Sequence, residues 1–260
     1  SLLPRMRKWW ESSIMKSSNY DPISAPWVWT AAELAARDDW IFPLSVGVLE
    51  EIDCALSEIK QRGLEMGSIT ASDFPLPSYR CDLAAIKTSL ESGPGMSLIR
   101  GIPVDKYNLE DLRLILWGIG THIGLGAPQS FRGDKIGDVM DMSHTGDIRR
   151  SYRSPRPLYL HVDPIDIVGL LCTRQAKEGG TSLLTSAAAL HNTLLAERPD
   201  LMPELYRGYH YSSTEASSTG EPPVTSYRVP VYRSVGKQIV VNCNASPIGK
   251  ALGHEGVKSD

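Results

Sequence analysis

The sequence lacks features that would each indicate a particular class of protein. No apolar run approaches the roughly 18 residues needed to cross a bilayer, so we expect no membrane-spanning segment. Its 27 Lys and Arg stand against 30 Asp and Glu, a net charge of -3, so there is no basic excess to neutralise nucleic-acid phosphates. The first residues hold no apolar stretch typical of a secretory signal. These absences exclude nucleic acid and membranes as expected partners.

Cysteine is also scarce. The four cysteines lie far apart and form no CxxC pair, which argues against a zinc ribbon and against a disulfide framework: Cys54, Cys81, Cys172 and Cys243. A reducing compartment fits this pattern, so we expect a cytoplasmic protein. At 260 residues, with 42% hydrophobic and 22% charged residues, the chain is expected to form a single large globular domain.

Helical patterns dominate the first third. Thr30 and Glu33 have the spacing of a capping box, and the next amphipathic stretch has Ser45 placed to cap its start and Gly63 to end it. Further helices are predicted at residues 78–95, 108–124 and 186–201. Tryptophan pairs near the start suggest an N-terminal extension that packs on the domain or on a second subunit, so a homo-oligomer is possible.

Short strands follow the helices. An apolar run at residues 96–102, bounded by glycines and a proline, predicts a buried strand. Further strands are predicted at residues 158–163, 167–176, 181–186, 227–235 and 237–244, with a long loop at 212–226. Helices followed by strands predict an α+β domain built on an antiparallel barrel or sandwich.

One pair of residues suggests chemistry. His161 and Asp163 are two apart on a predicted strand, so their side chains share a face, together with Tyr159 if the strand is regular. With a second histidine from elsewhere, such a pair forms the 2-His-1-carboxylate site that leaves open positions on Fe(II). The same pair could equally be hydrogen-bonded at a strand end, because H-x-D is a short motif.

The sequence around this pair resembles the taurine dioxygenase/TfdA-like family of Fe(II)- and 2-oxoglutarate-dependent oxygenases. The resemblance runs through "GMSLIRGIPVD", "GLGAPQSFRGDKIGDVMD", "LYLHVDPIDIVGLLCTRQAKEGGTSLLTSAAALHNTLLAERPDLMPELY" and "GEPPVTSYRVPVY". It implies a double-stranded β-helix, that is a jelly-roll or cupin-like barrel, with N-terminal and flanking helices. The single oxygenase domain would span residues 1–260, with a mainly helical part at 1–95 and the barrel core at 96–260.

The resemblance also implies roles for individual residues. His161 and Asp163 match two iron ligands, and Ser182, beside Thr181, matches a hydroxyl that bonds a carboxylate of 2-oxoglutarate; both hydroxyls could instead simply begin a strand. Gln129 and Tyr159 are candidates to face the substrate, although a loop amide such as Gln129 can equally bond backbone. The implied cofactors are Fe(II), the co-substrate 2-oxoglutarate and O2.

The pattern departs from the family after the metal pair. The family places a second histidine, and then an arginine that binds 2-oxoglutarate, well over a hundred residues further on, whereas only residues 164–260 follow Asp163. The available candidates match that position poorly: His191, His210, His254, Arg228 and Arg233. We expect the distal histidine to lie beyond Asp260, together with the last barrel strands.

The first functional hypothesis is therefore an oxygenase that hydroxylates, desaturates or cyclises a small polar substrate such as an amino acid or a carboxylate. The second is a truncated, catalytically defective relative that acts as a binding or regulatory protein. The third is a metal-free barrel that binds a small molecule.

Overall fold

The computed structural model describes residues 20–128, 133–145, 153–212, 222–235 and 238–254. The chain divides into two compact units. The helical unit comprises Ser24–Gly137 and Ile167–Ser186, and the hairpin unit comprises Ser1–Ile23, Asp138–Asp166 and Ala187–Asp260. Both contain helices and short strands, which confirms the predicted α+β class. Within the described ranges, no helix has the length and apolar character needed to cross a membrane.

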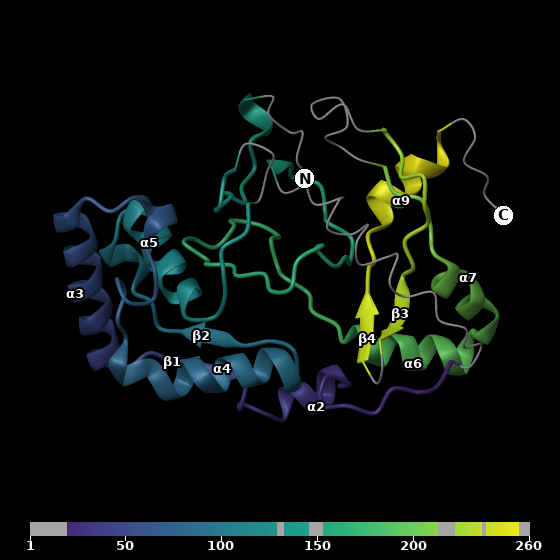
Figure 1. Ribbon diagram of the computed structural model, residues 1–260, viewed down its shortest axis with the longest axis horizontal. Coiled ribbons are helices and arrows are strands. Elements are labelled where there is room, and N and C mark those ends of the chain that lie inside the picture. The colour runs from purple at the N-terminus through teal and green to yellow at the C-terminus, as the bar shows by residue number, and fades with distance from the viewer. Residues whose placement is uncertain (1–19, 129–132, 146–152, 213–221, 236–237, 255–260) are drawn as a thin grey trace. The chain divides into compact units, whose positions relative to one another are not determined.

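The elements of the helical unit are α2 (Ala31–Ala35), β1 (Ile41–Pro43), α3 (Val46–Arg62), α4 (Arg80–Ser92), β2 (Leu98–Arg100) and α5 (Leu109–Thr121) (Figure 1). The predicted helix ends are confirmed. Thr30 and Glu33 form the capping box of α2, and the Ser45 hydroxyl accepts a hydrogen bond from the Val48 N–H at 3.3 Å. Gly63 ends α3 with a φ of 62°, a left-handed conformation that glycine adopts without the steric cost of a Cβ atom.

The first two strands form a parallel pair in which Phe42 lies opposite Ile99. The predicted strand at 96–102 is confirmed in a shorter form, but it is not buried throughout: Leu98 and Arg100 are exposed, and only Ile99 turns toward the core. Side chains alternate along a strand, so only one face of β2 reaches the interior. Its partner β1 was not predicted, because three residues ending in a proline show no period.

The core of the helical unit lies between α3, α4, α5 and the segment at 69–76. Ile52, Ile59 and Ile86 each expose 1% or less of their surface. Burial of such a side chain contributes about 1.5–3 kcal/mol, so the apolar faces of these helices supply most of the stability of the unit. The side chains buried in this cluster are Phe42, Val48, Ile52, Ala55, Leu56, Ile59, Ile69, Phe74, Leu76, Tyr79, Leu83, Ile86, Leu112, Ile115 and Ile119.

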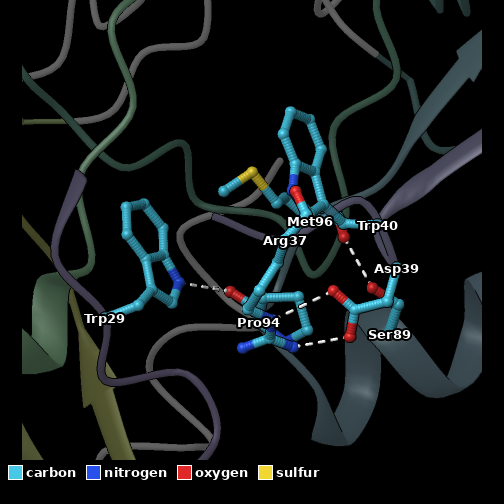
Figure 2. A network of polar contacts seen from close by, with 7 residues as sticks. All are labelled: Trp29, Arg37, Asp39, Trp40, Ser89, Pro94 and Met96. Carbon is cyan, nitrogen blue, oxygen red and sulfur yellow. Dashed lines mark hydrogen bonds and ion pairs between the residues drawn. The ribbon is translucent and has the colours of Figure 1, made fainter. Parts of the chain in front are cut away.

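Polar contacts attach neighbouring segments to the end of α4 (Figure 2). The indole Nε1 of Trp29 donates to the Pro94 carbonyl at 2.8 Å, and the Ser89 hydroxyl donates to the Met96 carbonyl at 2.6 Å. The Trp29 bond joins the segment before α2 to the turn between α4 and β2, and the Ser89 bond joins α4 to the same turn. The buried Trp29 therefore packs inside the helical unit, whereas Trp9 and Trp10 lie outside the described residues.

The elements of the hairpin unit are α6 (Ala187–Glu197), α7 (Met202–Arg207), β3 (Tyr232–Val235), β4 (Gln238–Val241) and α9 (Ala245–Leu252). The two strands pair antiparallel, with Tyr232 opposite Val241. They lie inside the predicted strands at 227–235 and 237–244, which are thus confirmed in shorter form. The predicted helix at 186–201 is confirmed by α6.

The other predicted strands are not formed. Residues 158–163, 167–176 and 181–186 are irregular apart from a single bridge at His161, and Leu170, Leu183 and Leu184 expose 73%, 76% and 68% of their surface. An apolar run becomes a strand only when another strand pairs with its N–H and C=O groups. The described residues supply no such ladder here, so the prediction of these strands is wrong for this structure, and the closed barrel stays a prediction.

The hairpin unit has a buried aromatic cluster around His191. The His191 ring is fully buried, 5.0 Å from the Tyr232 ring in an edge-on arrangement, and its Nε2 lies 3.0 Å from the Tyr206 hydroxyl. His191 is therefore a packed residue of the hairpin unit. Burial disfavours the charged imidazolium, so the pKa of His191 is lowered from its ordinary value.

This burial predicts a loss of stability in mild acid. As pH falls below about 6.5, His191 of the unfolded chain takes up a proton while the folded residue, with its lowered pKa, stays neutral, so the unfolded state binds more protons and stability decreases. Thermal unfolding between about pH 7.5 and 5 should show a steeper decline for the wild type than for His191→Gln. Equal slopes for the two proteins would contradict the prediction.

Candidate metal centre

The segment that carries the H-x-D pair is held by the residues that follow β4. His161 forms an antiparallel bridge with Asn244, and the Val162 N–H donates to the Cys243 carbonyl at 2.7 Å. Asn244 is also the N-cap of α9, where its side-chain oxygen accepts from the Ser246 N–H. The backbone at residues 161–162 is therefore held against the residues that lead into α9, within the hairpin unit.

The hydrogen bond of the His161 ring determines which nitrogen is available to a metal. Nδ1 lies 2.7 Å from the Tyr159 carbonyl oxygen. A carbonyl only accepts, so Nδ1 carries the proton, and Nε2 of the neutral ring keeps its lone pair. Metal-binding histidines use this arrangement, in which one nitrogen donates to a carbonyl or carboxylate and the other binds the ion.

His161 Nε2 and the Asp163 carboxylate lie close to each other. His161 Nε2 lies 3.7 Å from Asp163 Oδ1, beyond hydrogen-bonding range, and both side chains are partly exposed, at 32% and 48%. One divalent ion bonded to each atom at about 2.0–2.2 Å would fit, because the two bonds together span about 4.2 Å. The separation lets one ion contact both atoms, and the assignment of the pair as iron ligands stays a prediction.

The part of the chain that the structure describes brings no third protein ligand to this pair. Among the residues that the structure describes, no group of three His, Cys, Asp or Glu side chains could hold a metal ion. His191 is buried against Tyr206, and His210 Nδ1 lies 2.7 Å from the Thr225 carbonyl. His254 follows the end of α9 and is exposed. The distal ligand stays a prediction.

The predicted 2-oxoglutarate residues belong to the helical unit. Thr181 and Ser182 are exposed and follow Gly179 and Gly180, whose φ angles of 68° and 70° lie in the left-handed region. Their proposed contact with a carboxylate is a prediction that this geometry does not test. Gln129 lies outside the described residues.

Two other candidates have clear positions. Tyr159 is 78% exposed, and its carbonyl accepts the hydrogen bond from His161 Nδ1. Arg228 Nη1 lies 3.3 Å from Glu204 Oε1 and 3.1 Å from the Gly208 carbonyl, so it stabilises the end of α7 as a structural residue. The supporting groups at the metal pair, the Tyr159 and Cys243 carbonyls, were not foreseen, because main-chain acceptors leave no mark in a sequence.

Comparisons with known proteins identify the family of the chain. The family described as taurine catabolism dioxygenase TauD, TfdA family matches residues 59–253. FR-33289 synthase of Streptomyces rubellomurinus is 29% identical over 214 residues, which cover 81% of this chain and 62% of that protein. Taurine hydroxylase-like protein SAT17 of Stachybotrys chartarum is 26% identical over 199 residues, which cover 71% of this chain and 50% of that protein. The chain thus spans only about half to three-fifths of the length of these relatives. Because the family match covers most of the sequence, the chain belongs to the taurine catabolism dioxygenase TauD, TfdA family.

Proposed function

We propose that the chain is part of a non-heme Fe(II)- and 2-oxoglutarate-dependent oxygenase that oxidises a small polar substrate such as an amino acid or a carboxylate. The observation that carries the proposal is the state of His161. Its Nδ1 proton is bound by the Tyr159 carbonyl and its Nε2 lone pair lies 3.7 Å from the Asp163 carboxylate. Membership of the dioxygenase family supports the same chemistry.

When bound, Fe(II) with 2-oxoglutarate and O2 supplies the oxidation of an unactivated C–H bond. The residues of the chain have simpler roles. His161 and Asp163 bind the ion through one nitrogen and one oxygen, and the Tyr159 carbonyl keeps the imidazole in the required tautomer and orientation. Hydroxylation, desaturation and ring closure are all outcomes that this set of residues allows.

The substrate class and the fold form part of the proposal. The names of the family and of one relative refer to taurine, itself a small polar molecule. The double-stranded β-helix expected for the family is proposed for the complete protein, and the β3–β4 hairpin that follows the metal pair is consistent with two of its strands. The distal histidine and the arginine for 2-oxoglutarate belong to the proposed site as well.

The direct test of the activity is turnover of the co-substrate. The purified chain is incubated with Fe(II), 2-oxoglutarate and O2, and succinate is measured with and without a panel of amino acids and small carboxylates. The proposal predicts succinate above the metal-free background and an increase with a substrate of this class. Succinate at the background level throughout would contradict it.

Replacing Ser182 by Ala tests the predicted contact with the co-substrate. A hydrogen bond to a charged group contributes about 1.5–3 kcal/mol, so we expect the affinity for 2-oxoglutarate to fall by about tenfold or more while Fe(II) affinity changes little. Thr185→Ala, which removes another exposed hydroxyl three residues further on, is the matched control. An unchanged 2-oxoglutarate affinity in Ser182→Ala would remove this residue from the site.

A binding or regulatory protein without catalysis is the second candidate function. It is favoured by one observation, namely that the described residues assemble only two of the three protein ligands. Such a protein would bind the small substrate yet form no succinate, whereas the oxygenase would form it. The turnover experiment therefore separates the two functions.

A further inference from the structure

A hollow of about 450 Å³ lies on the surface of the helical unit, against one face of α4. Its other walls are the segment at 71–77 and His122, which follows α5. This volume is within the range of small-molecule sites. None of the residues proposed for iron or 2-oxoglutarate lines this α4 hollow, so a ligand here would be additional to the proposed function.

The walls of the α4 hollow are apolar and held in place. Leu76 and Leu83 expose 3% and 5% of their surface and belong to the core, while Pro75 and Pro77 restrict the backbone beside them. His122 Nε2 lies 2.7 Å from the Phe74 carbonyl, which can only accept, so the ring donates and holds the middle of this segment. A ligand with an apolar body would meet a surface that is already formed.

Positive charge lies at both ends of the same helix face. Arg80 and Lys87 both line the hollow, with Ala84 between them. The two cations are seven positions apart, which is two turns of helix or about 10 Å. Neither forms an ion pair or a side-chain hydrogen bond within the described part of the chain. Both charges are thus available to an anion.

Two carboxylates of the neighbouring segments, those of Asp73 and Glu51, are engaged elsewhere. Asp73 pairs with Arg62 at 2.9 Å and accepts from the Thr70 hydroxyl at 2.7 Å. Glu51 accepts from the Ser78 N–H at 3.1 Å. The side chains that line the hollow include no acidic residue, so its charge is positive and would repel an organic cation.

We propose that the α4 hollow binds an amphiphilic organic carboxylate. The apolar part of the ligand packs on Leu83 and the two prolines, and the carboxylate pairs with Arg80, whose planar guanidinium suits two parallel hydrogen bonds. Lys87 adds attraction from the other end of the face. The apolar wall favours a ligand with a hydrocarbon body, and the unpaired cations favour a carboxylate. The hollow should therefore prefer such a ligand to a small hydrophilic anion.

The test is calorimetric titration of the full chain with octanoate in the presence of a metal chelator and without 2-oxoglutarate, so that the result is independent of the proposed iron site. Octanol, which has the same hydrocarbon chain but no charge, is titrated in parallel. We expect octanoate to bind with one-to-one stoichiometry and octanol to bind at least about tenfold more weakly, since a charged hydrogen bond is worth about 1.5–3 kcal/mol. No octanoate binding, or equal binding of both compounds, overturns the proposal.

Variants locate the site. Arg80→Gln and Lys87→Gln should weaken octanoate binding, with the larger effect, about tenfold, at Arg80. Lys177→Gln removes an exposed cation of the same unit outside the hollow and should bind octanoate like the wild type. Ala84→Trp should fill the hollow and abolish binding of octanoate while the thermal unfolding midpoint is kept. Unchanged affinity in both Arg80→Gln and Ala84→Trp would show that octanoate binds elsewhere and would reject the site.

Discussion

Replacing His161 or Asp163 by Ala should lower succinate formation by about 100-fold or more, because each change would remove one of the two proposed iron ligands. Loss of a group that merely supports a ligand already costs about 10–100-fold in metal affinity or activity. The variants remain folded, because both side chains are partly exposed and lie outside the buried clusters of either unit. The measurements are the rate of succinate formation, the bound iron per chain and the thermal unfolding midpoint.

Asp166→Ala is the matched control, since it removes an exposed aspartate three residues beyond the metal pair. This variant should keep the iron content and the rate of the wild type. Retained turnover in His161→Ala or in Asp163→Ala would reject the assignment of that residue. An equal loss of iron and of succinate formation in Asp166→Ala would show that any change in this segment disturbs the site.

Adding one methyl group to α5 should destabilise the helical unit at Gly118 and stabilise it at Gly120, two residues further on. A Cβ atom on Gly118 would lie 2.4 Å from the ring of Phe74, which is fully buried. Overpacking of this kind costs about 1–3 kcal/mol. A Cβ on Gly120 meets nothing within 4 Å, so Gly120→Ala gains about 0.5–1 kcal/mol from helix propensity.

Chemical denaturation of the two variants measures both effects on one helix. The free energy of unfolding should decrease in Gly118→Ala and increase in Gly120→Ala. If Gly118→Ala were as stable as Gly120→Ala, the packing of Phe74 against α5 would be wrong. Far-UV circular dichroism before denaturation confirms that each variant starts from the folded state.

The helices of the helical unit could be predicted because their signals are local. Ser45 and Gly63 bound α3 within one residue at either end, and the capping box at Thr30 is formed by a residue three positions away. Caps and apolar periodicity act over a few residues, so they can be read without knowing the fold.

Strands depend on partners that are distant in the sequence. The apolar run at 167–176 looks like a strand, yet it is irregular, since pairing rather than hydrophobicity forms a strand. Conversely, β1 forms from three residues because β2, more than fifty residues away, supplies its hydrogen bonds. No local pattern could have revealed β1.

The candidate site divides in the same way. His161 and Asp163 are two residues apart, so the sequence alone places them close together. The bridge to Asn244 and the hydrogen bond to Cys243 join segments some eighty residues apart in the chain and became visible only in the structure. A distal histidine is a contact of this long-range kind, which spacing alone does not identify.

Anaerobic titration of the purified chain with Fe(II) in the presence of 2-oxoglutarate tests the central claim most directly. The account predicts that one Fe(II) binds per chain, with a visible charge-transfer band of the iron–2-oxoglutarate chelate that is absent in His161→Ala. No Fe(II) binding, or a band of equal intensity in His161→Ala, would contradict the assignment of His161 and Asp163 as the iron-binding pair.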